Sequence, residues 1–295
     1  MLVLVTGAAG RLGSATCEQM RAAGIEFRAT DVHSRKDIGY RVVVENLLSP
    51  EACYRLVEGC DAVVHIANRP GEHSGSAQAI FGENCTMNIN VFQAAMELGV
   101  KKIIYASSVQ AMIGSRRTRQ ASDVPSIHAY LPADGESPAN PGNHYGASKV
   151  AGEQLLKYFV AHRSLESAVA VRFPALIHTD RIDRLRQHFN INSMWPEEYI
   201  DELATWLSYS DGGRLIAAAL KSNLPGYRCY FPTSPSMRYD VSEKEFIERF
   251  YASVPLRKPI EQMHGLADIS RITADTGWKP VDDFSPSKPE PAQPK

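Results

Sequence analysis

The residues of this sequence best suited to chemistry are Tyr145 and Lys149, in the segment Tyr-Gly-Ala-Ser-Lys. Residues four apart are neighbours on one face of a helix, so a helix here would bring the phenol beside the ammonium group. An isolated tyrosine has a pKa of about 10, and a nearby cation favours the phenolate. The pair could therefore act as a base that takes the proton of a substrate hydroxyl. The alternative is an ordinary exposed pair on a helix surface.

A third candidate group precedes this pair, at the end of the segment Tyr-Ala-Ser-Ser. We expect Ser108 to hydrogen-bond the same substrate oxygen as Tyr145 and to hold the reacting carbon in position. Ser107 is its rival, because adjacent residues of a strand point to opposite faces and only one of the two hydroxyls can serve.

A glycine-rich segment near the N-terminus predicts a dinucleotide site. Gly7, Gly10 and Gly13 follow the apolar run Leu2–Val5 and open a helical pattern. In such a loop the first glycine permits a tight turn, the second lets the backbone approach a pyrophosphate, and the third lets the helix pack on the sheet. The N-terminus of the helix then offers free amide groups and the positive end of its dipole.

An acidic residue at the expected distance favours NAD as the cofactor. Asp31 ends the second apolar segment, where a carboxylate accepts hydrogen bonds from ribose hydroxyls and repels a 2′-phosphate. Arg35 could reach a 2′-phosphate, but Asp31 is better placed, so we expect NAD rather than NADP. Together with Tyr145, these residues predict hydride transfer between a nicotinamide and an alcohol or carbonyl.

The elements that must position these groups alternate through the first 180 residues or so. Apolar segments and helical patterns in alternation predict an α/β fold of the Rossmann type, a doubly wound parallel sheet with helices on both faces. Such a sheet binds ligands beyond the carboxyl ends of its strands. The expected strands are Leu2–Val5, Glu26–Thr30, Arg41–Val44, Ala62–Ile66, Lys102–Ala106 and Ala168–Phe173, and the expected helices are Gly13–Ala23, Pro50–Val57, Asn84–Leu98 and Tyr145–Ala161.

The pattern changes after about residue 178. We expect residues 1–178 to form the NAD-binding core with the catalytic residues. Residues 179–281 should form a smaller substrate-binding lobe, with a strand at Tyr227–Phe231 that could return to the core and a helix at Val241–Tyr251. Residues 282–295 are rich in proline, serine and lysine, and we expect them to be disordered.

Composition narrows the class of protein. The chain has 295 residues and a formal net charge of -1, which gives no electrostatic argument for binding nucleic acid or a membrane surface. No apolar run is long enough to span a bilayer, and no leader-like segment opens the chain. The five scattered cysteines suit reduced thiols, so we expect a cytoplasmic protein. The nine histidines show no ligand spacing, and we expect no metal site.

The motifs together resemble those of the extended short-chain dehydrogenases/reductases, the NAD-dependent epimerase/dehydratase superfamily. Arg172-Phe173-Pro174 resembles the strand that runs toward the nicotinamide in this family, and Asn84 is expected to open a helix. The resemblance implies that the cofactor contacts Gly7, Gly10, Arg11, Leu12, Gly13, Asp31, Asn46, Leu47, Ile66, Ala67, Asn68, Ser107, Tyr145, Lys149 and Pro174.

The resemblance also implies a homodimer. The segments Asn84–Leu98 and Tyr145–Val160 would meet their symmetry mates. Apolar surface for this contact is expected from Phe92, Met96, Leu156 and Phe159, although part of it must face the sheet.

A narrower resemblance concerns the substrate. The segment Leu203–Asp211 is similar to one in the uronate dehydrogenases, which oxidise hexuronic acids at C1 with NAD. That group usually has Asn-His after the serine pair, where this sequence has Val109-Gln110, and Ala175 replaces a polar residue of related enzymes. We therefore expect a free sugar or sugar acid, with Ser108 and Gln110 beside it.

Two arginines could bind an acidic group of such a substrate. Arg181 or Arg184 could bind a carboxylate with two parallel hydrogen bonds if their segment faces the cleft. A solvated, charged surface is an equal alternative.

Three functions remain open from the sequence. The first is an NAD-dependent dehydrogenase of a sugar or sugar acid. The second is a nucleotide-sugar epimerase that retains its cofactor, and the third is a non-catalytic NAD-binding regulatory protein. The complete set of Ser108, Tyr145 and Lys149 disfavours the third function, while Ala175 and Leu203–Asp211 favour the first over the second.

Overall fold

A seven-stranded parallel sheet forms the centre of the molecule, in the order β3-β2-β1-β4-β5-β6-β9. The computed structural model describes residues 1–71, 73–113, 128–181, 200–239, 241–263 and 265–284. The strands of the sheet are β1 (Leu2–Thr6), β2 (Glu26–Asp31), β3 (Val42–Val44), β4 (Ala62–His65), β5 (Lys102–Ser108), β6 (Ser167–Phe173) and β9 (Gly226–Tyr230). The predicted α/β fold is confirmed.

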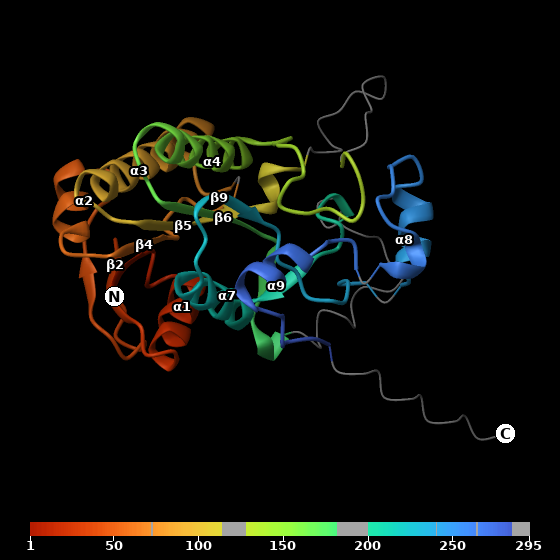
Figure 1. Ribbon diagram of the computed structural model, residues 1–295, viewed down its shortest axis with the longest axis horizontal. Coiled ribbons are helices and arrows are strands. Elements are labelled where there is room, and N and C mark those ends of the chain that lie inside the picture. The colour runs from red at the N-terminus through yellow and green to blue at the C-terminus, as the bar shows by residue number, and fades with distance from the viewer. Residues whose placement is uncertain (72, 114–127, 182–199, 240, 264, 285–295) are drawn as a thin grey trace.

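Helices cover both faces of this sheet (Figure 1). One face carries α1 (Arg11–Ala22) and α7 (Tyr209–Lys221), which pack against each other. The other face carries α2 (Pro50–Val57), α3 (Ala77–Glu97) and α4 (His144–His162), with α3 packed between α2 and α4. The strand order reverses between β1 and β4, which is the switch point where folds of this type bind ligands.

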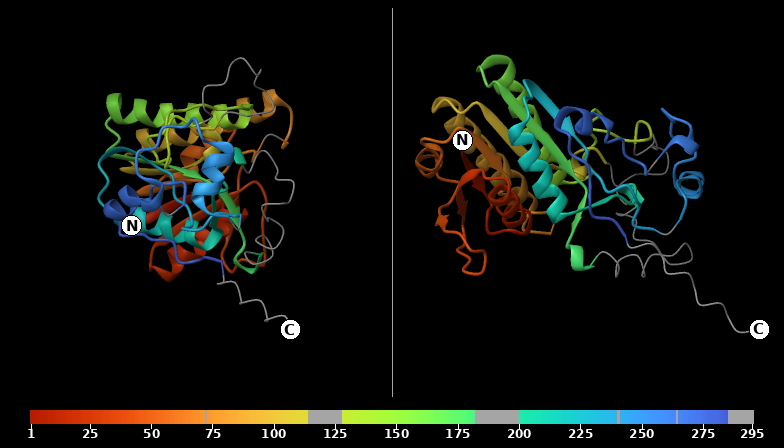
Figure 2. Two further views of the ribbon diagram at one scale, coloured as in Figure 1. Left: turned by 90° about the vertical axis from the view of Figure 1, so that its right-hand side faces the viewer. Right: turned by 60° about the horizontal axis from the view of Figure 1, so that its bottom comes forward.

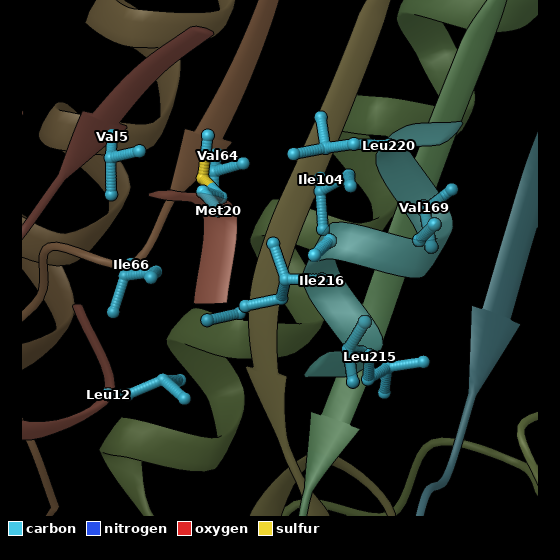
Figure 3. Close-up of a cluster of buried hydrophobic side chains, with 14 of the residues drawn as sticks. Val5, Leu12, Met20, Val64, Ile66, Ile104, Val169, Leu215, Ile216 and Leu220 are labelled. Atoms are coloured by element: carbon cyan, nitrogen blue, oxygen red, sulfur yellow. The ribbon is translucent and has the colours of Figure 1, made fainter. Parts of the chain in front are cut away.

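Two apolar clusters hold these layers together, one on each face of the sheet. Alternation along a strand sends Val3 and Val5 to one cluster and Leu4 to the other. Figure 3 shows the first cluster, where Met20 of α1 and Ile216 of α7 lie against strand residues such as Ile104. Strands buried on both faces are typical of parallel sheets, and this explains their nearly continuous apolar sequences.

A smaller lobe lies beyond the carboxyl ends of the strands, around α8 (Glu243–Phe250) (Figure 2). Its own apolar cluster includes Leu131, Leu203, Tyr239 and Phe246. The short elements are η1 (Val109–Ala111), β7 (Ala175–Ile177), η3 (Thr179–Arg181), β8 (Trp206–Ser208), η4 (Ile260–Gln262) and α9 (Ser270–Thr276), and β7 pairs with β8 in a separate two-stranded sheet.

The segment expected to form this lobe, 179–281, divides between lobe and core. β9 pairs with β6 and completes the central sheet, as the sequence left possible, and α7 packs on α1. No helix in the described part of the chain is long and apolar enough to cross a membrane.

Two boundaries differ from the expected ones. Helix α3 begins at Ala77, seven residues before Asn84, because Ser76 accepts a hydrogen bond from the Ala79 amide and caps the helix. At the other end of the chain, Asp282 accepts a hydrogen bond from Arg214, and Phe284 packs on Trp206. The ordered chain therefore continues past the boundary expected at residue 282, and the rest of that tail lies outside the described residues.

Candidate active site

A cleft of about 1200 Å³ runs along the carboxyl edge of the sheet. Its walls come from the ends of β1, β2, β4, β5 and β6, and from the loops that follow them. Every predicted cofactor residue except Lys149 lines it, namely Gly7, Gly10, Arg11, Leu12, Gly13, Asp31, Asn46, Leu47, Ile66, Ala67, Asn68, Ser107, Tyr145 and Pro174.

The glycine loop has a shape that side chains would destroy. Gly7 has a φ of +67°, in the left-handed region, and a Cβ there would lie 2.7 Å from the Ala67 amide nitrogen. A Cβ on Gly13 would lie 2.0 Å from the Gly7 carbonyl oxygen. No side chain caps the start of α1 after Gly10, so its first amides remain available to an anion in the cleft.

Asp31 ends β2 and faces the same cleft. Its Oδ2 accepts a hydrogen bond from the Ala9 amide at 3.0 Å, which ties the carboxylate to the glycine loop. Arg35 also lines the cleft, but its guanidinium binds Asp37 with two hydrogen bonds, at 3.0 and 2.6 Å, and the Ala9 carbonyl at 2.9 Å. The arginine that could have bound a 2′-phosphate is therefore engaged elsewhere.

One buried polar atom in the cleft wall has no hydrogen-bond partner among the residues that the structure describes. Asn68 donates from Nδ2 to the Ile66 carbonyl at 2.7 Å, whereas its Oδ1 accepts no hydrogen bond from the described residues. Buried acceptors are normally satisfied, so a hydroxyl of a bound ligand fits here. With the glycine cradle and Asp31, this atom makes the cleft suitable for a dinucleotide.

The two adjacent serines at the end of β5 are used differently. Ser107 donates a hydrogen bond from Oγ to Glu153 at 2.6 Å, and Glu153 also holds Arg172 in a buried ion pair at 2.8 Å. Ser108 lines the cleft, and its hydroxyl lies close enough to the phenol of Tyr145 to lower the pKa of that phenol. The geometry therefore favours Ser108 over Ser107 as the hydroxyl beside a reacting group.

Tyr145 and Lys149 lie one turn apart in the first half of α4. Asn143 caps this helix by accepting a hydrogen bond from the Gly146 amide at 2.8 Å. The Nζ of Lys149 lies 5.4 Å from the centroid of the Tyr145 ring. The helix therefore brings the two groups together as the spacing predicts, with Tyr145 on the cleft wall and Lys149 buried beneath it.

Burial dominates the electrostatics of both groups. It raises the pKa of Tyr145 to about 12, and the nearby charge of Glu202 acts in the same direction, while the hydrogen bond from Ser108 opposes it. Burial lowers the pKa of Lys149 to about 7, against the stabilising charge of Glu153. For the protein groups alone, burial thus outweighs the lowering of the phenol pKa that we expected from Lys149.

A buried polar network behind the site was not anticipated from the sequence. His65 contacts Thr6 Oγ1 at 2.8 Å and Asn88 Oδ1 at 3.1 Å, and Asn88 donates to the Tyr105 hydroxyl at 3.3 Å. The Nζ of Lys149 lies 4.9 Å from the centroid of the Tyr105 ring. Burial and the charge of Lys149 lower the pKa of His65 to about 3, so this histidine is neutral.

The predicted substrate residues are placed less uniformly. Gln110 follows Ser108 but is not on the cleft wall, and both ends of its amide bind protein groups, Glu202 and Asn143. Arg181 is exposed on η3 and does not line the cleft, and Arg184 lies outside the described residues.

Three charged residues near the site were missed because isolated residues carry no sequence signal. Arg69 and Glu83 form an ion pair on the cleft wall, and Glu202 lies close enough to Tyr145 to affect its pKa. No group of three or more potential metal ligands occurs among the described residues.

Comparison with known proteins agrees with this geometry. Residues 3–177 match the model of the NAD dependent epimerase/dehydratase family. The chain is 30% identical over 228 residues to the NAD-dependent glucose-6-phosphate dehydrogenase of Haloferax volcanii, covering 75% of this chain and 80% of that protein. It is 30% identical over 222 residues to the uronate dehydrogenase of Pseudomonas putida, covering 74% and 70%.

A solved structure supports the fold. A short-chain dehydrogenase/reductase superfamily protein from Agrobacterium tumefaciens, with bound NAD, superimposes with a TM-score of 0.68 at 16% identity, over 95% of this chain and 93% of that one. The predicted family and its NAD dependence are confirmed. The chain belongs to the NAD dependent epimerase/dehydratase family.

Proposed function

We propose that this protein is an NAD-dependent dehydrogenase that oxidises a hydroxyl group of a free sugar or sugar acid. The observation that best supports this is the contact between Ser108 and Tyr145 on the wall of the dinucleotide cleft, with Lys149 beneath the phenol ring. Relatives named as dehydrogenases of glucose 6-phosphate and of uronate favour the same substrate class.

In this proposal each residue has a separate role. Ser108 donates a hydrogen bond to the substrate oxygen, and Tyr145 removes the hydroxyl proton through its phenolic oxygen. NAD held in the cleft would supply the hydride acceptor and a positively charged nicotinamide ring. That charge and Lys149 together favour the phenolate against the effect of burial. The alcohol group of the substrate thus loses a hydride from its carbon and a proton from its oxygen, and becomes a carbonyl.

Production of NADH tests the proposal directly. A panel of aldoses, hexuronic acids, sugar phosphates and nucleotide sugars is incubated with NAD, and absorbance of NADH is followed. We expect at least one free sugar or sugar acid to yield net NADH. An epimerase would convert a nucleotide sugar without net NADH, and a regulatory protein would bind NAD without turning over any substrate; either result would reject the proposal.

We also propose that the protein is a homodimer formed through α3 and α4. Phe92, Leu156 and Phe159 are buried in the core rather than available for contact. The exposed apolar residues on these helices are instead Phe81, Ile89 and Tyr158, which are 39%, 38% and 41% exposed. Light scattering of the protein and of an Ile89→Asp variant tests this, since only the variant should be monomeric at micromolar concentration.

The cytoplasmic location also remains a proposal. All five cysteines, Cys17, Cys53, Cys60, Cys85 and Cys229, are unpaired in the structure. Free thiols are typical of a reducing compartment, and fractionation of cells that express the tagged protein would test the location.

A further inference from the structure

Glu202 is a buried carboxylate that no motif of the sequence singles out. The residue is 9% exposed and lies just before β8, at the edge of the smaller lobe. Its Oε1 accepts a hydrogen bond from Gln110 Nε2 at 2.7 Å, and its Oε2 lies 3.4 Å from Arg238 Nη2. Its charge acts on the phenol of Tyr145. Charged side chains are rarely buried unless they are paired, and the partners of Glu202 are Gln110 and Arg238.

The side chain of Gln110 connects this carboxylate to the catalytic helix. Gln110 Oε1 accepts a hydrogen bond from Asn143 Nδ2 at 2.9 Å, and Asn143 Oδ1 caps α4 at the Gly146 amide. The backbone amide of Gln110 also donates to Ser108 Oγ at 3.2 Å. One glutamine therefore contacts the turn that carries Ser108 and the cap of the helix that carries Tyr145.

The backbone next to Glu202 adopts an unusual conformation. Leu203 and Ala204 have φ angles of 58° and 50°, and both are fully buried. Non-glycine residues rarely occupy this left-handed region, and such strain concentrates at functional sites. The turn is fixed because Thr205 Oγ1 donates to the Glu202 carbonyl at 2.6 Å and the Arg238 amide donates to the Ala204 carbonyl at 2.9 Å.

We propose that Glu202 is a positioning residue of the catalytic centre, which holds the Gln110 amide between Ser108 and the cap of α4 and so fixes Tyr145 relative to Ser108. An amide can rotate about its last bond and exchange its donor and acceptor ends. With a carboxylate on one side, only the orientation that presents NH₂ to Glu202 and oxygen to Asn143 satisfies both neighbours. The strained turn then keeps the carboxylate at the distance that this bridge requires.

The charges around this bridge come from several elements. Lys149 lies on α4 itself, Arg238 and Asp201 belong to the lobe, and Glu153 acts on Lys149 from the next turn of α4. A change in the charge of Glu202 must therefore be separated from a change in its geometry, which an isosteric variant allows.

The test uses the full-length protein and four variants. Glu202→Ala and Gln110→Ala break the bridge, whereas Glu202→Gln keeps an acceptor oxygen for Gln110 but removes the charge and the acceptor that faces Arg238. Glu248→Gln changes an exposed glutamate of α8 and serves as the matched control. Hydrogen exchange of the segment 141–150 reports on the cap of α4 without any substrate. We expect exchange about fivefold to tenfold faster in the two alanine variants, as loss of one hydrogen bond would produce.

Kinetics provides the second measurement and depends on the proposed function. Both alanine variants should lose about tenfold or more in kcat, with little change in NAD affinity, because misplacement affects the reacting geometry rather than binding. Glu202→Gln should retain most of the rate. In the unaltered protein the charge of Glu202 raises the pKa of Tyr145, so its removal should lower that pKa and move the acid limb of the pH profile to lower pH.

The two measurements separate the possible failures. If no sugar is oxidised by the unaltered protein, the proposed function fails and hydrogen exchange still decides the present inference. Glu202→Ala leaves Arg238 without this carboxylate and could unfold the lobe. In that case the inference is decided by Gln110→Ala, which breaks the bridge and keeps the ion pair. Folded alanine variants with unaltered exchange in 141–150 and unaltered kcat would overturn the inference.

Discussion

The Nζ of Lys149 lies 5.4 Å from the ring of Tyr145 and donates a hydrogen bond to the Ala106 carbonyl at 2.7 Å. The carbonyl belongs to β5, two residues before Ser108. This contact fixes the distance between the catalytic helix and the strand end. It also places the buried ammonium group beneath the ring of Tyr145, whose phenol is half-buried on the cleft wall.

Replacing Tyr145 by Phe should remove turnover and leave NAD binding nearly intact. The change deletes only the oxygen that accepts the substrate proton, and loss of a general base costs about 10²–10⁴-fold in rate. Steady-state kinetics and calorimetric titration with NAD measure the two effects. A variant with most of its activity would show that another group is the base.

Replacing Lys149 by Met should change how stability depends on pH. Burial lowers the pKa of Lys149 from the ordinary 10.5 to about 7. Between these values the unfolded chain binds a proton that the native chain does not, so stability rises with pH across this window. Below pH 7 both states carry the proton and this contribution no longer changes.

Thermal unfolding from pH 6 to pH 10 measures the effect. Relative to Lys149→Met, the unaltered protein should gain stability from pH 7 upward, by a few kcal/mol at most, since each unit of pKa shift corresponds to about 1.4 kcal/mol. Parallel curves for the two proteins would mean that the lysine is not desolvated as the structure indicates.

The preference for NAD should depend on Asp31 and, less obviously, on Asp37. Asp31→Ala should weaken the binding of NAD and relax discrimination against NADP, because the carboxylate that binds the ribose hydroxyls and repels a 2′-phosphate is lost. Discrimination should relax further in Asp31→Ala/Asp37→Ala, because Arg35 is then released from its ion pair to reach a 2′-phosphate. Titration with both cofactors measures this, with Asp37→Ala as the control. Tighter binding of NADP by the unaltered protein would contradict the assignment.

The sequence predicts the sheet and the cofactor cleft because both depend on local patterns. Apolar runs define the strands, glycines define the loop, and the parallel strands then carry Gly7, Asp31 and Ser108 to one edge. The spacing of Tyr145 and Lys149 likewise determines that they meet on a helix.

The parts that the sequence did not predict depend on contacts between distant residues. Gln110 was expected beside the substrate, yet its amide binds Glu202, 92 positions further along the chain. Helix α7 was not predicted, and its packing on α1 depends on a contact between segments far apart in the sequence. The left-handed backbone at Leu203 and Ala204 could not be predicted, because neither residue is a glycine.

Glu202 should also influence which substrate is accepted. Its charge raises the pKa of the Tyr145 phenol. In the proposed function, the substrate hydroxyl binds at that phenol. The carboxylate of a uronic acid is ionised at neutral pH and would be repelled in the same region. We therefore expect the unaltered protein to prefer a neutral aldose over the corresponding uronic acid.

The isosteric variant Glu202→Gln tests this preference. Removing the charge should raise kcat/KM for the uronic acid relative to the aldose, by about tenfold if one repulsion of about 1.4 kcal/mol is relieved. Glu202→Asp keeps the charge and should retain the aldose preference, and Glu248→Gln should leave the ratio unchanged. The same ratio in Glu202→Gln and the unaltered protein would mean that the carboxylate does not act on the substrate, whatever its part in holding Gln110.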